Sequence, residues 1–158
     1  MSIAIELAAL FKRDLSRLIQ EVSAFPDEAT LWAKQEGVSN SAGNLALHLE
    51  GNLREYVGRQ LGNIDYIRDR QSEFSSTGIS LEDVLSGIRD LPDSISQVVA
   101  GLAPEALDRT YPEAALGILL TTRQFLIHLL SHLNYHLGQI DYIRRILTKG
   151  RAISLTGL

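Results

Sequence analysis

The sequence of 158 residues contains no cysteine. This absence excludes disulfide bonds, metal sites built on thiolates and catalysis by a cysteine nucleophile. Any metal ion held by this chain must therefore be bound by histidine nitrogens and by oxygen atoms. The sequence also lacks a serine–histidine–acid set, a phosphate-binding loop and a nucleotide-binding fingerprint, so no such motif narrows the reaction that the protein could catalyse.

A surplus of basic residues is missing as well. Lysine and arginine number 15 against 19 aspartate and glutamate residues, which gives a net charge of −4. This balance argues against a nucleic-acid-binding surface, which normally has a basic face. No apolar run approaches the roughly 20 residues that span a membrane, and the first residues lack the basic and apolar segments of a signal peptide. We therefore expect a soluble cytoplasmic protein that binds neither nucleic acid nor a membrane.

The apolar residues are spaced as in helices along most of the chain. Helices are predicted over residues 3–22, 42–62, 80–102 and 121–149. Pro92 must kink or split the third of them, because proline lacks the helical N–H and its ring clashes with the preceding turn. The charged segment 63–77 is predicted to be irregular. No segment alternates with the period typical of strands, so the expected fold class is all-α, a four-helix bundle formed by a single domain over residues 1–158.

One segment of eight residues occurs nearly twice. Positions 61–68 read LGNIDYIR and positions 137–144 read LGQIDYIR. In the first copy Gly62 is a candidate for the residue that terminates the helix. The second copy lies inside a predicted helix, so the first helix could equally continue past Gly62. The match is too short to establish an internal duplication.

Three of the four histidines are spaced four residues apart in one predicted helix. Because a helix turns by about 100° per residue, His128, His132 and His136 form one stripe on one face. The fourth, His48, lies in the middle of another predicted helix, and all four have mainly apolar sequence neighbours. A buried imidazole needs a hydrogen-bond partner or a metal ion, so this pattern requires an explanation.

Two explanations of the histidines are open. Histidines at i and i+4 offer two nitrogens to one metal ion, and a histidine from a facing helix completes a three-histidine set that leaves a coordination position open. Alternatively, the histidines are core residues whose nitrogens bind backbone carbonyls. Spacing alone does not decide between them, since pairs at i and i+4 are common in helices.

Two blocks of the sequence resemble proteins of the DinB-like (YfiT-type) family. The first block extends from Asn44 to Phe74 and includes LHLEGNLR at positions 47–54 and RDRQSEF at positions 68–74. The second block, HLNYHLGQI at positions 132–140, is similar to the family's C-terminal His-x-x-x-His-x-Gly-Gln signature. The blocks occur in the family's order, and the resemblance covers nearly the whole chain.

The resemblance implies a helical bundle with a divalent-metal site made by three histidines. The family's ligands map onto His48, His132 and His136, and this register leaves His128 as a core residue or an outer neighbour of the ligands. The cofactor would be a divalent transition metal, with zinc and nickel as the first candidates, although histidine also suits copper and iron. Members of the family are often homodimers. Some resemble thiol-dependent S-transferases, others resemble hydrolases, and many have no assigned activity.

Helix geometry nominates residues near these ligands. Asn52 and Asn44 lie one turn after and one turn before His48, and Gln139 follows His136 by three residues. Each of these side chains could bind the outer nitrogen of a ligand or orient a substrate. Each of the three can equally be interpreted as a polar residue of helix packing or capping, and for Asn44 this is the preferred interpretation.

The predicted site supports three functional hypotheses. The first is a metal-dependent enzyme, of transferase or hydrolase type, whose ion activates a water or a substrate thiol. Glu55, seven residues after His48, is the one acidic residue nominated as a general base, and a solvated helix carboxylate is its other interpretation. The second hypothesis is a non-catalytic helical bundle that dimerises or binds a partner. The third is a stress-related protein that holds a small molecule at the metal without turnover, and the sequence specifies no substrate.

Overall fold

The structure is a computed structural model that describes residues 2–114 and 117–154. Within these ranges the regular elements are helices, and the one β-type pairing is an isolated bridge between Thr110 and Thr121. The all-α class predicted from the sequence is confirmed. In the part of the chain described, no helix is both long enough and apolar enough to cross a membrane.

Helical elements occur along the described part of the chain, from Ile3 to Thr148. They are α1 (Ile3–Ser23), α2 (Glu28–Trp32), α3 (Ala42–Leu53), the π-helical segment η1 (Arg54–Arg59), α4 (Gln60–Gly62), α5 (Arg70–Ser75), α6 (Leu81–Ile88), α7 (Leu91–Ala100), α8 (Pro104–Asp108) and α9 (Thr122–Thr148).

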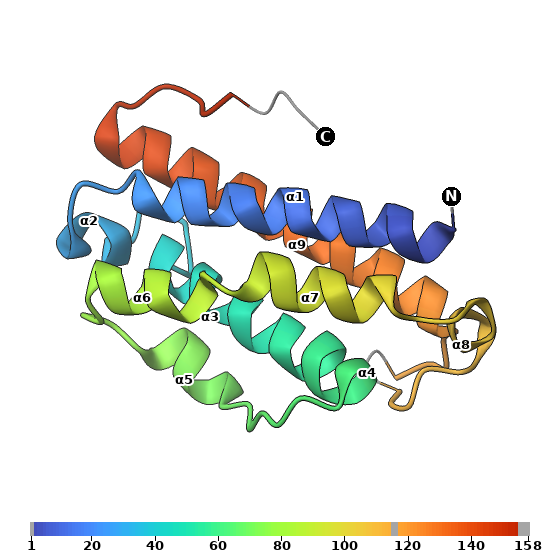
Figure 1. Cartoon of the computed structure of the whole chain (residues 1–158). Coiled ribbons are helices and arrows are strands. Elements are labelled where there is room, and N and C mark those ends of the chain that lie inside the picture. Colours follow the sequence, from blue (N-terminus) through green and yellow to red (C-terminus); the bar gives the residue numbers. More distant parts are fainter. Residues whose placement is uncertain (1, 115–116, 155–158) are drawn as a thin grey trace.

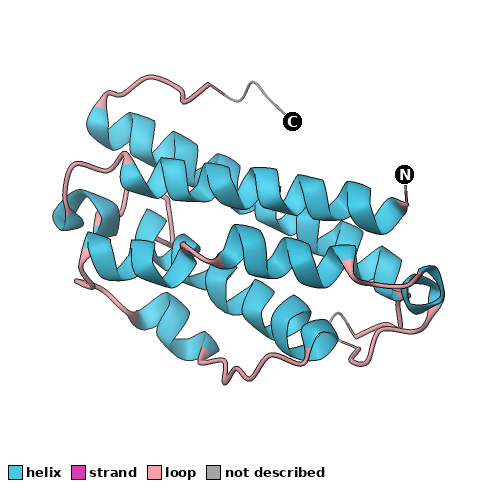
Figure 2. Ribbon diagram, viewed as in Figure 1, coloured by secondary structure: helices cyan, strands magenta, loops and turns pink. Residues whose placement is uncertain are grey.

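The long elements lie side by side as a bundle, with the loops gathered mainly at its two ends (Figures 1 and 2). α1 packs against α7 and α9, and α3 packs against α9, α5 and α6. The run α3–η1–α4 forms one continuous helical rod that corresponds to the second predicted helix. The bundle therefore brings α3 and α9, the two histidine-bearing helices, into direct contact.

The core is built from the apolar stripes that the sequence predicts. Each long element contributes large side chains with almost no exposure, including Phe11, Leu15, Leu18, Leu49, Leu53, Ile88, Leu91, Ile95, Leu126 and Leu133. Burying one such side chain stabilises the fold by about 1.5–3 kcal/mol relative to leaving it in water. This packing fixes the distance and rotation of α3 relative to α9.

Capping interactions fix where α3 and α9 begin. The Ser41 hydroxyl accepts from the Asn44 N–H at 3.1 Å, and the Asn44 amide oxygen accepts from the Ser41 N–H at 3.2 Å. Thr121 and Gln124 make the same reciprocal pair at the start of α9, at 3.2 Å and 2.9 Å. Such a capping box satisfies backbone donors that a helix start otherwise leaves free. These capping bonds therefore fix the residue at which each of the two histidine-bearing helices begins.

The third predicted helix is split rather than kinked. α6 and α7 are separate, and Pro92 lies in the first turn of α7, where its missing N–H removes no intrahelical bond. Arg54 stabilises the break, because its guanidinium donates to the Gly87 carbonyl at 2.7 Å and to Asp90 at 2.6 Å. These bonds attach the α3–α4 rod to the α6–α7 junction.

The two copies of the repeated segment adopt different structures. Gly62 is the last helical residue, in agreement with the predicted range 42–62, but the left-handed residue that terminates the helix is Asn63, with φ of 51°, and not Gly62. The corresponding residue in the second copy is Gln139, which lies inside α9. Position 63/139 is the only difference between the copies. Asparagine enters the left-handed region more readily than most residues, which explains why the first copy ends there.

The segment predicted to be irregular contains a short helix, α5. Asp69 caps it by accepting from the Ser72 N–H at 3.0 Å. The Asn44 side chain anchors it to α3 by donating to the carbonyls of Glu73 at 3.1 Å and Ser76 at 2.9 Å. Six residues are too few to display a helical period in the sequence, so α5 was not predictable from apolar spacing.

A buried ion pair joins α1 to α9. The Arg144 Nε donates to Glu21 Oε2 at 2.5 Å, and both side chains are only 4% exposed. Arg144 also donates to Asp141 and to the carbonyl of Arg151, each at 3.2 Å. The pair therefore holds both the α1–α9 packing and the chain that follows α9.

Replacing Arg144 by methionine should destabilise the protein by about 3–5 kcal/mol, because Glu21 would be left buried without its partner. The matched control is Arg89→Met, which breaks the exposed Arg89–Glu82 pair and should cost less than about 1 kcal/mol. Urea unfolding followed by circular dichroism measures both values. A similar loss in the two variants would contradict the importance of the buried pair.

Candidate metal centre

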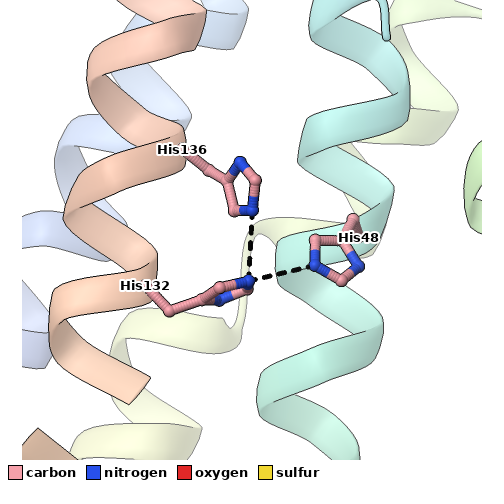
Figure 3. Close-up of side chains that lie close together, drawn as sticks. All are labelled: His48, His132 and His136. Atoms are coloured by element: carbon pink, nitrogen blue, oxygen red, sulfur yellow. Dashed lines mark hydrogen bonds between the residues drawn. The ribbon is translucent and has the colours of Figure 1, made fainter. Parts of the chain in front are cut away.

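Three histidine side chains converge between α3 and α9. Figure 3 shows His48 pointing from α3 toward His132 and His136, which project from successive turns of α9. The Nε2 atom of His132 lies 3.1 Å from the Nε2 atoms of both His48 and His136. One ligand atom from each residue lies within 4.8 Å of the others. The structure thus brings together the three residues that the family resemblance nominates.

The outer nitrogens of two of these rings have oxygen partners. His48 Nδ1 lies 2.8 Å from Glu73 Oε2, and His136 Nδ1 lies 2.7 Å from Gln139 Oε1. Because both oxygens are acceptors, each Nδ1 carries the ring proton and donates it. The Nε2 atoms of His48 and His136 are then left with lone pairs, and both lone pairs face His132.

This arrangement fits a divalent cation. The single Nε2 proton that His132 could carry can satisfy only one of the two lone pairs that face it. The other nitrogen of His132, Nδ1, is buried without a hydrogen-bond partner in the described structure. Two histidine nitrogens bound about 2.0–2.1 Å from one ion are separated by about 2.8–3.4 Å for ligand angles between about 90° and 110°. The two separations that include His132, each 3.1 Å, lie within that interval, and all three ligand atoms lie within 4.8 Å of one another.

Burial keeps the α9 histidines neutral, which is the form that binds metal. Desolvation, together with repulsion from the neighbouring His136, His48 and His128, lowers the pKa of His132 to about 3. Desolvation also lowers the pKa of His136, although its hydrogen bond to Gln139 acts in the opposite direction. Neither ring carries a charge at neutral pH.

Glu73 and Arg68 complete the surroundings of His48, and sequence reasoning missed both roles. Arg68 donates to the two carboxylate oxygens of Glu73, with Nε at 2.6 Å and the terminal nitrogen at 2.8 Å. Burial raises the pKa of Glu73, but the hydrogen bonds from His48 and Arg68 outweigh it and hold the pKa below its usual value. Glu73 is therefore an ionised acceptor for the His48 proton. The signal for it was the RDRQSEF block, which the resemblance used without assigning roles to its residues.

Three other nominated side chains lie on the histidine-bearing helices. Gln139 contacts the outer nitrogen of His136, as proposed from its spacing. Asn52 is buried, and within the described structure its amide oxygen has no hydrogen-bond partner. Asn44 caps α3 and anchors α5, in agreement with its structural interpretation.

The remaining candidates lie outside the group of three ligands. The half-buried His128 ring stacks between Phe125 and His132, at centroid distances of 5.9 Å and 6.3 Å. Glu55 accepts hydrogen bonds from Arg59 and Gln60, and the bond from Arg59 is the main cause that lowers its pKa. A lowered pKa makes a carboxylate a weaker base, so this environment does not favour Glu55 as a general base.

The metal-free protein should lose stability as the pH falls from about 6.5, the pKa of a free histidine, toward about 4. In that range the unfolded chain binds protons that the folded His132 does not, and the folded His136 binds its proton at a lower pH than the unfolded chain does, so protonation favours unfolding, whereas above about pH 7 neither state binds them. Urea unfolding with a chelator at several pH values measures the effect. His132→Gln, which cannot be protonated, should have a weaker pH dependence, and an unchanged dependence would contradict this assignment.

Comparison with known proteins identifies the family. The DinB superfamily model matches residues 10–140. The fold is similar to that of a DinB-like protein from Bacillus subtilis, with a TM-score of 0.68 and 16% identity over 95% of this chain and 96% of that chain. It is also similar to that of a DinB-like protein from Bacillus cereus ATCC 10987, with a TM-score of 0.66 and 14% identity over 92% and 90% of the two chains. No curated protein gives a significant match. Since the family model matches most of the chain and includes His48, His132 and His136, the chain belongs to the DinB superfamily.

Proposed function

We propose that this protein binds one divalent transition-metal ion through His48, His132 and His136 and is a metal-dependent enzyme of transferase or hydrolase type. The observation that supports the proposal most directly is that the Nε2 atoms of His48 and His136 each lie 3.1 Å from His132 Nε2, while the outer nitrogens of His48 and His136 are already engaged. Zinc and nickel are the first ions to test, because both accept imidazole ligands.

Three histidine ligands leave at least one coordination position for a water or a substrate atom. A divalent ion held there would act as a Lewis acid and lower the pKa of a bound water or thiol. The chain's own contribution is orientation, because Glu73 and Gln139 fix the rings of His48 and His136 with their Nε2 lone pairs turned inward. Burial contributes by lowering the pKa values of His132 and His136, which favours their neutral form.

A cavity beside the site supports a small-molecule substrate. It has a volume of about 630 Å³ and lies between α9 and the loop at residues 35–40, with His136 and Gln139 in its wall. Its remaining lining is mainly apolar and includes Leu45, Tyr135 and Tyr142. Cavities of about 300–1,000 Å³ with apolar walls and a few polar groups are typical of small-molecule sites.

The non-catalytic alternative is less well supported by this geometry. A bundle whose histidines were core residues would bind their nitrogens to backbone carbonyls, whereas here two Nε2 lone pairs face a third ring. A protein that holds a small molecule at the metal without turnover would use the same site. The homodimer implied by the family resemblance stays a prediction, and light scattering of the purified protein tests it.

The protein purified without an affinity tag should contain one transition-metal ion per chain, or acquire one on incubation with zinc or nickel. His132→Ala should lose the ion, because it removes the ring at the centre of the three. His128→Ala is the matched control on the same helix and should keep it, since His128 lies outside the ligand group. Elemental analysis by mass spectrometry measures the stoichiometry. Equal loss in both variants would mean that the ligand register is wrong, and no metal in the wild type after reconstitution would reject the proposal.

Metal removal should lower the thermal stability. An ion that binds only the folded state adds about 2.7 kcal/mol when its free concentration is 100 times its Kd. The melting temperature should therefore fall when a chelator is added to the wild type, and it should not change when chelator is added to His48→Ala. Differential scanning fluorimetry measures both shifts. A chelator effect of the same size in the variant would show that the stabilising ion binds elsewhere.

A further inference from the structure

The carboxylate of Glu73 lies in a space that exists only because residue 51 is glycine. Gly51 is in α3, one turn from His48, and Glu73 reaches it from α5. A Cβ atom at position 51 would lie 2.2 Å from Glu73 Oε1 and 2.9 Å from Glu73 Cδ. Carbon and oxygen atoms do not approach this closely, so any larger residue at position 51 would displace the carboxylate.

The same carboxylate is held from its other side by Arg68. The Arg68 guanidinium makes two hydrogen bonds to Glu73, at 2.6 Å and 2.8 Å, and both side chains are at most 10% exposed. A paired guanidinium and carboxylate have a fixed planar geometry, which limits where Glu73 Oε2 can lie. The carboxylate is thus confined between the α3 backbone and the Arg68 side chain.

This confinement positions the proton acceptor of His48. Glu73 Oε2 lies 2.8 Å from His48 Nδ1. Arg68 has a nitrogen 3.4 Å from the same atom, but guanidinium nitrogens only donate, so Glu73 alone can accept the ring proton there. His48 therefore has a charged acceptor, whereas the acceptor of His136 is the neutral amide of Gln139.

We infer that Gly51, Glu73 and Arg68 form a positioning unit that fixes the proton of His48 on Nδ1 and thereby sets the affinity of the three-histidine site for its metal. The inference rests on the proposed metal binding. Glu73 contacts the outer nitrogen of His48 and not the Nε2 side that faces His132, so it affects metal binding only through the ring of His48. Loss of such an outer partner typically weakens metal binding by about 10- to 100-fold. Because a charged acceptor forms the stronger hydrogen bond, displacing Glu73 should weaken binding more than Gln139→Ala does.

Zinc titration of the metal-free protein against a competing chelating dye tests the inference. Gly51→Ala changes none of the ligands and should weaken zinc binding by about 10- to 100-fold. Gly58→Ala is the matched control, because it places the same methyl group in the same helical rod with no atom beyond the adjacent helical backbone and chain neighbours closer than 4.0 Å, and its affinity should stay within about twofold of the wild type. Glu73→Gln keeps an acceptor oxygen in place and should lose less affinity than Gly51→Ala. Wild-type affinity in Gly51→Ala would overturn the inference.

A second measurement does not require metal. In the wild type and in Gly58→Ala treated with chelator, nitrogen–proton correlation NMR of the histidine rings should show His48 protonated on Nδ1. In Gly51→Ala the Nε2-protonated form should become populated. If the wild type bound neither zinc nor nickel, the proposed function would fail, and the NMR comparison would still decide whether the unit fixes the proton. If His48 kept its proton on Nδ1 in Gly51→Ala, the inference would be overturned whatever the zinc result. Glu73→Ala repeats the comparison by removing the carboxylate without adding an atom to α3.

Discussion

The packing of α3 against α9 is the constraint on which the candidate site depends. His48 comes from one of these helices, and His132 and His136 come from the other. His48 Nε2 lies 3.1 Å from His132 Nε2 across the two helices, a distance that depends on apolar side chains such as Leu49 and Leu133, which set how far apart the helices lie. The same packing removes the rings of His132 and His136 from water and lowers their pKa values, which favours their neutral form. One set of apolar contacts therefore supplies both the geometry and the protonation state that a metal ion requires.

The contacts outside the three rings are not equivalent. His136 is oriented from within its own helix by Gln139, three residues further on. His48 is oriented by Glu73, a residue of a separate short helix that reaches α3 across a glycine. The orientation of His136 thus needs only α9, whereas that of His48 depends on the tertiary docking of α5. Damage to the connection between α4 and α5 would consequently affect one ligand and spare the other two.

Features that depend on local spacing were predictable from the sequence, and those that depend on long-range contacts were not. The i, i+4 spacing of His132 and His136 and the capping pairs at the starts of both helices follow from helical geometry. The position of Glu73 could not be predicted from helical spacing, because α5 has only six residues and is held against α3 by hydrogen bonds from a side chain. The nomination of Glu55 assumed a uniform helix from His48 onward. The π-helix η1 begins at Arg54, and its wider turns change the rotation per residue. The face on which Glu55 lies can therefore not be predicted from the α-helical rotation that starts at His48.

The π-helical segment also has a mechanical consequence for the site. The backbone carbonyl of Tyr56, inside η1, accepts a hydrogen bond of 2.6 Å from the hydroxyl of the buried Tyr111. Tyr111 belongs to the strand-like stretch that pairs with Leu120 just before α9 begins, through a backbone bond of 2.8 Å. The rod that carries His48 is thereby fastened to the start of the helix that carries His132 and His136. A ligand that pushed these two helices apart would strain this connection. The hydrogen bonds of Tyr111 therefore resist separation of the histidine-bearing helices at the end of the bundle where α9 begins.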